Sequence, residues 1–397
     1  MSADVGPWLP GRLDPGVEWQ SRWFAGAGPN SADRWQGSTA LRLGYEHDWD
    51  GGRQALRGRA FARWDSDDER RSHADLRELS WYYTAENWQL QAGVAQVFWG
   101  VVEFNHLIDV VNQTDLVENI DMEAKLGQPL AALTLFRPWG TLELYGLVGF
   151  REREFPGLEG RITQALPVLS DGQFEADADR RRFDGLIRLA TALGGADLEL
   201  YHFSGTRRTP RLLPATDTAG EPALTPFYDD VQQSAVSAQT GINNTAVKLE
   251  ALYQSGGPQR YVAAALGIEH TLVGILGSTS DLGLVLEYHY DERGNAAFDT
   301  IFERDLAVGL RFGRNDQFDS QALFGIVWDH STDEILLSLE AERRLNDHWR
   351  VALEGRWFLG ATPVGRFDSA TAIADPRNKL GAFADDDYLQ LEIVRFF

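Results

Sequence analysis

Apolar side chains recur at every second position along much of the chain. Between Leu282 and Tyr290 the alternate residues are leucine or tyrosine, and the residues between them are Gly283, Val285, Glu287 and His289. Alternate side chains of an extended chain point to opposite faces, so the pattern predicts a β-strand with one apolar face. The same alternation recurs in the segments 41–45, 88–94, 142–148, 306–312, 335–341 and 349–353.

This alternation predicts an all-β protein of about 18 strands, with 16 as the alternative count. The expected strands, with bounds accurate to about 2 to 4 residues, are 15–26, 37–48, 54–65, 73–83, 86–98, 125–137, 139–151, 183–193, 196–206, 229–241, 244–255, 260–273, 279–291, 302–313, 319–330, 333–344, 347–359 and 387–397.

The connections between these strands are unequal. Those after even-numbered strands are short, whereas the long ones are 99–124, 152–182, 207–228 and 360–386. Short periplasmic turns and long outer loops are typical of bacterial outer-membrane barrels. We therefore expect one transmembrane antiparallel up-and-down β-barrel spanning residues 1–397, with both termini on the periplasmic side.

Composition narrows the class of protein. The chain has no cysteine, so disulfides and thiolate sites are excluded. No apolar run approaches the roughly 18 residues that a membrane-spanning helix needs, and the net charge of -22 argues against nucleic acid as a partner. No signal peptide precedes Ala3, which suggests a mature form behind an added Met1.

Tryptophan is abundant, with 13 residues, and most fall at expected strand ends. Amphipathic rings prefer the headgroup level of a membrane, although tryptophan also fills the cores of soluble β-sandwiches. The residues expected at the membrane interfaces are Trp19, Trp23, Trp49, Trp64, Trp81, Trp99, Trp139, Trp328, Trp349 and Trp357.

The last strand, 387–397, is amphipathic and ends in Phe397. A C-terminal aromatic residue on such a strand resembles the insertion signal that outer-membrane barrels present to the barrel-assembly machinery. Bacterial outer-membrane localisation follows, with lipid and lipopolysaccharide as surroundings. Lipopolysaccharide phosphates could bind arginines in the outer loops, at Arg70-Arg71, Arg180–Arg182 and Arg207-Arg208.

If the apolar face is outward, the opposite face of each strand lines the lumen, and its charges are segregated along the sequence. We therefore expect the closed barrel to place a basic wall opposite an acidic one, with the last strand in the acidic wall. The alternative is that these residues form ion pairs across neighbouring strands and only stabilise the wall. The N-terminal strands contribute Arg22, Arg42, Arg57, Arg59, Arg63 and Arg77. The C-terminal strands contribute mainly acids: Glu250, Glu269, Glu287, Glu340, Glu342, Glu354 and Glu392, with His289, Lys248, Arg311 and Arg356 among them.

The connection 99–124 contains several valines together with Phe104 and Ile108, which would be costly to leave in water. We expect it to fold into the lumen or over its mouth and to constrict the pore. The alternative is that 101–111 forms an extra strand of an extended hairpin. The expected constriction residues are Phe104, Asn105, His106, Asp109, Asn112 and Asp115.

The same connection carries a family resemblance. Trp99-Gly100, then Ile108–Asn112, Asp115-Leu116 and Glu123–Lys125, resembles a motif of uncharacterised families of proteobacterial outer-membrane barrels; Gln113 stands where that motif has proline. These families are similar to porin-like and exopolysaccharide-export barrels. The resemblance implies a barrel in the outer membrane and, in some members, partnership with an exporter of hydrophobic molecules.

The sequence has no motif that favours an enzyme over a channel. The sequence contains no phosphate loop, nucleophile elbow or zinc-protease motif, and we expect no cofactor and no metal. Some outer-membrane barrels are enzymes, and His289 is the residue we would test for that function. The preferred hypothesis is a channel for small polar or charged solutes. The second is a barrel that handles lipid or hydrophobic molecules together with a periplasmic or inner-membrane partner.

Overall fold

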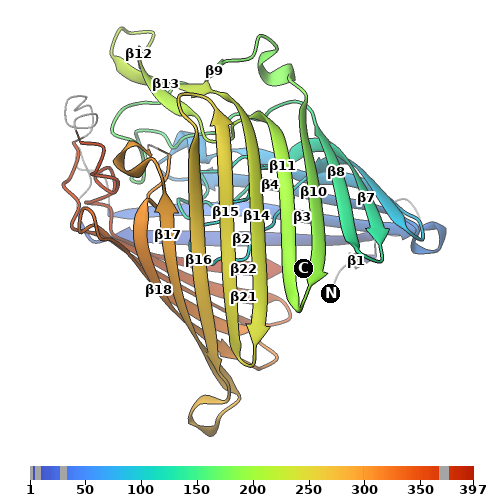
Figure 1. The fold of residues 1–397 in the computed structure, drawn as a ribbon. Helices are drawn as coiled ribbons and strands as arrows, with labels where there is room; N and C mark the ends of the chain where they lie inside the picture. The colour runs from blue at the N-terminus through green and yellow to red at the C-terminus, as the bar shows by residue number, and fades with distance from the viewer. Residues whose placement is uncertain (1–2, 5–9, 27–33, 298, 366–374) are drawn as a thin grey trace.

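The computed structural model describes residues 3–4, 10–26, 34–297, 299–365 and 375–397. In this described part of the chain, one antiparallel sheet of 19 strands forms the body of the molecule (Figure 1). Its smallest strand, β1 (Ala3–Asp4), pairs with β2. The other 18 form a closed barrel, because the first barrel strand, β2, also pairs with the last, β22.

All 18 expected strands are present, including 229–241, and the alternative count of 16 is wrong. The barrel strands are β2 (Arg12–Phe24), β3 (Trp35–Trp49), β4 (Gln54–Asp65), β5 (Ala74–Thr84), β6 (Trp88–Ala95), β7 (Gln128–Arg137), β8 (Gly140–Leu147), β10 (Asp184–Leu193), β11 (Ala196–Thr206), β14 (Asp230–Ile242), β15 (Thr245–Gly256), β16 (Tyr261–Leu272), β17 (Ser280–Asp291), β18 (Arg304–Arg314), β19 (Ser320–Asp329), β20 (Ile335–Asn346), β21 (Trp349–Leu359) and β22 (Tyr388–Phe396).

Helical structure is limited to short 3-10 turns, and no helix in the described residues is long and apolar enough to cross a membrane. These turns are η3 (Asp50–Gly52), η4 (Glu69–Arg71), η5 (Asp179–Arg181), η6 (Ile275–Gly277) and η7 (Gly294–Ala296).

The two faces of the barrel wall differ as the alternation predicts. On β17, Leu286 is 47% exposed on the outer face, whereas Glu287 and His289 are buried on the inner face. With no edge strand left, every strand can satisfy its backbone within the sheet, which is what a hydrocarbon environment requires. The apolar outer face and polar interior are therefore those of a membrane-spanning barrel.

Most of the expected interfacial tryptophans lie on the outside of the barrel, but Trp99 does not. Trp19, Trp23 and Trp328 are 40 to 44% exposed on the outer face. Trp99 is buried inside, where its indole N–H donates to the carbonyl of Ile108 and its ring packs against Tyr201. The expectation for Trp99 is wrong because strand β6 ends at Ala95. The chain then turns into the barrel before Trp99.

The long connections gather at one end of the barrel (Figure 1). Two of them contribute a separate three-stranded sheet of β9 (Gln173–Phe174), β12 (Arg211–Thr216) and β13 (Pro222–Tyr228), which the alternation did not predict. Residues 366–374 of the expected loop 360–386, and Met1, lie outside the described residues.

Candidate functional site

The connection between β6 and β7, residues 96–127, enters the barrel and crosses to strands far from its own. Two inner-wall carboxylates hold its first limb by accepting backbone hydrogen bonds. Glu250 of β15 accepts from Val101 at 2.6 Å and Val102 at 3.2 Å. Glu287 of β17 accepts from Glu103 at 2.6 Å and from Phe104 at 3.1 Å. The segment 101–111 forms no strand, so the alternative of an extra hairpin strand is wrong.

Phe104 lies against the inner wall, and two glycines make room for its ring. A Cβ atom built on Gly325 of β19 would stand 2.5 Å from Cε1 of Phe104, and one on Gly309 of β18 would stand 3.0 Å from its Cζ. Beside it, Glu103 forms an ion pair with Arg311 of β18. The first limb is therefore fixed by hydrogen bonds, an ion pair and ring packing.

The returning limb is bound to the opposite part of the wall. Glu118 forms a two-point ion pair with Arg63 of β4, with Nε to Oε1 at 2.9 Å and Nη2 to Oε2 at 2.9 Å. Asp115 lies 3.2 Å from Arg77 of β5. Arg63 is 2% exposed and also binds Glu18 at 2.7 Å, so this contact is dry and part of a larger charge network.

Directly after Glu118, the loop contacts the last barrel strands. Asn119 donates to Glu354 of β21 at 2.8 Å, and Asp121 lies 3.8 Å from Arg356 on the same strand. Burial, reinforced by the charge of Glu354, raises the pKa of Asp121 to about 7. The loop therefore contacts β4, β5, β15, β17, β18 and β21.

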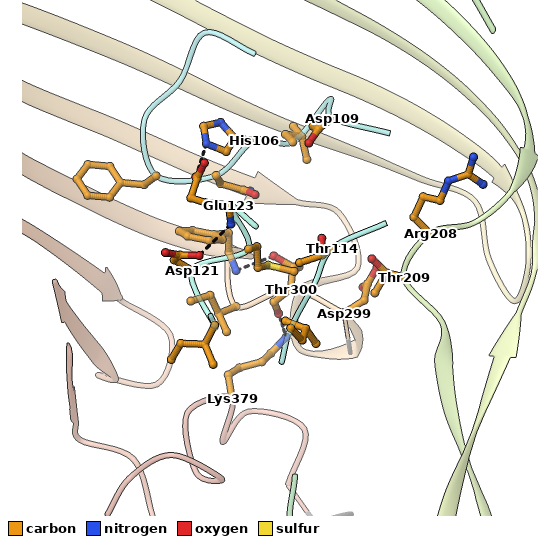
Figure 2. A pocket seen from close by; sticks show the side chains of 18 of the residues that line it. His106, Asp109, Thr114, Asp121, Glu123, Arg208, Thr209, Asp299, Thr300 and Lys379 are labelled. Carbon is orange, nitrogen blue, oxygen red and sulfur yellow. Dashed lines mark hydrogen bonds and ion pairs between the residues drawn. The ribbon is translucent and has the colours of Figure 1, made fainter. Parts of the chain in front are cut away.

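Contacts within the loop fix its own shape (Figure 2). His106 lies 2.6 Å from Glu123, and Asp109 pairs with Lys125 at 2.9 Å. Burial of the imidazole favours its neutral form, but the hydrogen bond and charge of Glu123 outweigh it and raise the pKa of His106. Asn112 bridges both ends of the loop, accepting from the N–H of Val97 and donating to two carbonyls. Asn105 contributes its carbonyl to a turn within the loop.

The arginines of the N-terminal strands are on the inner side but are mostly neutralised. Arg22 donates to Gln390, and the other five pair with acids: Arg42 and Arg63 with Glu18, Arg57 with Asp48, Arg59 with Glu78, and Arg77 with Asp115. These arginines therefore follow the alternative, in which they pair with neighbouring strands and loops and do not form an unpaired basic wall. Their exposure still differs: Arg59 is 69% exposed to the lumen and Arg63 only 2%.

The acids of the C-terminal strands fall into two groups. Glu250 and Glu287 lie across the barrel from β3 and hold the loop. Glu392 of β22 lies beside β2, not opposite it, because these strands pair where the barrel closes. The expectation that the last strand faces the arginines is therefore wrong. The remaining charges pair locally: Glu269 with Lys248 and Arg311, Glu340 and Glu354 with Arg356, and Glu342 and Glu392 with Arg350.

The described residues line two large cavities inside the barrel. The outer one, of about 1030 Å³, is lined by the crossing loop and by the outer loops. The inner cavity, of about 820 Å³, lies toward the short turns. Arg42, Arg59 and Gln96 are among the residues that line it. His289 lines the outer cavity, and its Nε2 lies 3.3 Å from Oε2 of Glu287.

Several residues that hold this arrangement were not singled out by sequence reasoning. Glu103, Glu118 and Asp121 are loop acids whose partners are inner-wall arginines, and Arg350 bridges two acids near the barrel closure. A usable signal was present, since a loop expected to lie among arginines should carry acids. Gln113, in place of the motif's proline, accepts a hydrogen bond from Arg153 at 3.0 Å.

The outer-loop arginines proposed for lipopolysaccharide contact are not all on the surface. Arg71, Arg207 and Arg208 are buried and bind groups inside the loops, because the outer loops fold over the lumen. Arg180 remains about half exposed. Among the described residues, no group of three or more histidine, cysteine, aspartate or glutamate side chains could hold a metal ion.

Neither a family model nor a curated protein sequence matches the chain. Among solved structures, the chain is similar to OccK3 (OpdO) of Pseudomonas aeruginosa, with TM-score 0.49, 10% identity and coverage of 97% of this chain and 95% of that one. It is also similar to OccK11 (OpdR) of the same organism, with TM-score 0.49, 10% identity, and coverage of 98% and 95%. A mutant porin of Rh. blastica gives TM-score 0.42 at 10% identity, covering 97% and 99%. The closed barrel with its apolar outer face is the architecture of a bacterial outer-membrane protein.

Proposed function

We propose that the barrel is an outer-membrane channel for small polar or charged solutes, and that residues 96–127 form its constriction. The observation that carries the proposal is the anchoring of this loop on opposite sides of the lumen. Glu250 and Glu287 hold one limb, and Arg63 and Arg77 hold the other. A barrel of 18 strands is wide enough for an aqueous passage, so what fills it decides what passes.

The charged groups beside the loop support selection by charge and dipole. Arg59 and Arg42 are well exposed in the inner cavity, each next to a carboxylate partner. A solute that passes between such fixed pairs exchanges part of its hydration for contacts with both signs of charge. This favours polar and zwitterionic solutes over apolar ones on the periplasmic side of the loop.

Reconstitution in a planar bilayer tests the channel directly. The purified barrel is expected to give stable single-channel steps, and these steps should be absent when a heat-unfolded sample is added. A well-folded sample that inserts but remains electrically silent would overturn the proposal. If the barrel conducts, swelling of liposomes in solutions of small sugars or amino acids shows which uncharged and zwitterionic solutes pass through it.

One observation favours a second candidate, a barrel that handles hydrophobic molecules with an export partner. On the inner wall, Val327 of β19, Leu336 of β20 and Phe358 of β21 are direct cross-strand neighbours and form an apolar row. Inner faces of porin-like barrels are normally polar. Lipid extracted from the purified barrel, in a fixed ratio to protein and lost in the Leu336→Asn variant, would favour this candidate.

A further inference from the structure

Arg153, in the outer connection between β8 and β10, is a buried cation without an acidic partner. Its guanidinium donates to the side-chain oxygens of Gln113 at 3.0 Å and Thr209 at 3.2 Å, both of which are neutral. Among the described residues it forms no ion pair, although it is only 8% exposed. A buried charge is costly unless it is paired, so an anion beside the Arg153 guanidinium would stabilise it.

The neighbouring arginines do not share this situation. Arg207 pairs with Asp299, Arg208 with Asp184 and Arg211 with Asp229. Asp299 also binds Arg293 at 2.7 Å. These nearby carboxylates are therefore already engaged. Burial lowers the pKa of Arg153 to about 10, which still leaves it charged at neutral pH.

Two further donors near the same outer cavity have no acceptor in the described part of the chain. They are Nε2 of Gln254, on the inner face of β15, and Nη2 of Arg208, both buried without a hydrogen-bond partner among the described residues. Gln254 is 2% exposed, so water does not replace the missing acceptor freely. Arg153, Arg208, Thr209 and Gln254 all line the cavity of about 1030 Å³, and Figure 2 shows Arg208 and Thr209 on one side of it.

We infer that the outer cavity contains a binding subsite for the oxyanion group of a small solute, with Arg153 as its principal cation. Thr209 and Gln254 supply neutral hydrogen bonds, and Arg208 supplies a second charged donor. A carboxylate or a phosphate offers the acceptor oxygens that this set of donors lacks. The inference rests on the proposed channel, in which the cavity is the first compartment that a solute meets from outside.

Calorimetric titration of the folded barrel in detergent tests the subsite without any current measurement. The ligands are benzoate and inorganic phosphate, and benzamide serves as the uncharged match for benzoate. We expect benzoate or phosphate to bind and benzamide not to bind. Saturation by phosphate alone would identify the phosphate class, and saturation by benzoate alone the carboxylate class. Equal binding of benzamide and benzoate, or no binding of either anion, would overturn the inference.

Variants assign the binding to this place. Arg153→Gln should weaken anion binding by about tenfold or more, as expected for the loss of a charge-assisted hydrogen bond. Gln254→Leu, which keeps the volume but removes the donor, should weaken it less. Arg180→Gln is the control, because Arg180 is in the same connection but half exposed and paired with Glu152. Unchanged affinity in Arg153→Gln and Gln254→Leu would place any anion binding elsewhere and refute the subsite.

The two proposals fail in different ways. If the barrel gives no current in a bilayer but binds benzoate or phosphate, the channel proposal is refuted and the subsite is retained. If it conducts normally but binds neither anion, the subsite is refuted and the channel is retained. If Arg153→Gln does not fold, as judged by heat-modifiable migration on a gel, Gln254→Leu and Thr209→Val carry the test.

Discussion

Arg63 on the inner face of β4 and Glu118 of the crossing loop form a buried two-point ion pair, with both principal contacts at 2.9 Å. The pair joins a strand near the start of the barrel to a loop that is anchored again on β15 and β17. Removing one member of such a pair leaves a buried charge without compensation, which costs about 3 to 5 kcal/mol. The crossing loop should therefore be sensitive to this single contact.

Arg63→Met should lower the stability of the folded barrel by several kcal/mol and loosen the loop, so that the open-channel current becomes larger and noisier. The stability change is measured by urea titration in detergent. The matched control is Arg12→Met. Arg12 forms an exposed pair with Glu46, with side chains 59% and 49% exposed, and loss of such a pair costs at most about 1 kcal/mol. Equal effects of the two substitutions would show that the Arg63 pair does not hold the loop.

A methyl group on Gly325 should displace Phe104. The new Cβ atom would stand 2.5 Å from the ring of Phe104 and 2.6 Å from Oγ of Ser338, and overpacking of this kind costs about 1 to 3 kcal/mol. Gly325→Ala should therefore raise conductance and lower stability, with a smaller stability loss in a Phe104→Ala background. Gly313→Ala is the control, because nothing lies within 4 Å of the Cβ position there. The same penalty with and without the Phe104 ring would mean that the ring is not seated on this glycine.

The His106–Glu123 pair predicts a pH dependence. The pKa of His106 is raised, so the stabilisation from its charged form is fully present below the ordinary value of 6.5 and is lost as pH rises through the raised pKa. Loop fluctuations in single-channel records should therefore increase as the pH rises above 6.5 and through the raised pKa of His106. His106→Gln should remove this part of the dependence. A wild-type record that becomes quieter with rising pH would contradict the assigned sign.

Removal of Phe397 should reduce assembly of the barrel in the outer membrane. The terminal residue is 45% exposed, its N–H donates to the carbonyl of Pro15 of β2, and Arg395 lies over its ring. Its loss removes both a contact at the barrel closure and the aromatic terminus that resembles an insertion signal. The measurement is the heat-modifiable fraction in outer-membrane preparations, with Leu276→Ala, an exposed turn residue, as the control. Full assembly without Phe397 would refute the signal.

The barrel could be predicted from sequence because a strand with one apolar and one polar face has apolar side chains at every second position. Leu286 and Glu287, neighbours in sequence, lie on opposite sides of the wall. The small sheet of β9, β12 and β13 could not be predicted this way. β9 has only two residues, and β13 pairs with it from a different loop, so neither gives a periodic pattern.

The partners of the inner charges were not predictable for a related reason. Alternation indicates that Arg63 points inward, but not that Glu118, 55 positions later in a loop, lies against it. The position of Glu392 was misjudged because closure of the barrel brings the last strand beside the first. Inward direction is a local property of a strand, whereas pairing depends on the course of a loop through the lumen.

Deletion of residues 104–115 tests the central claim that the crossing loop constricts the pore. The shortened barrel is compared in planar bilayers with the wild type and with a variant that lacks residues 217–220 at the exposed turn between β12 and β13. We predict a several-fold higher single-channel conductance for the first deletion and no change for the second. Unchanged conductance in a folded barrel without residues 104–115 would show that the loop does not limit the passage.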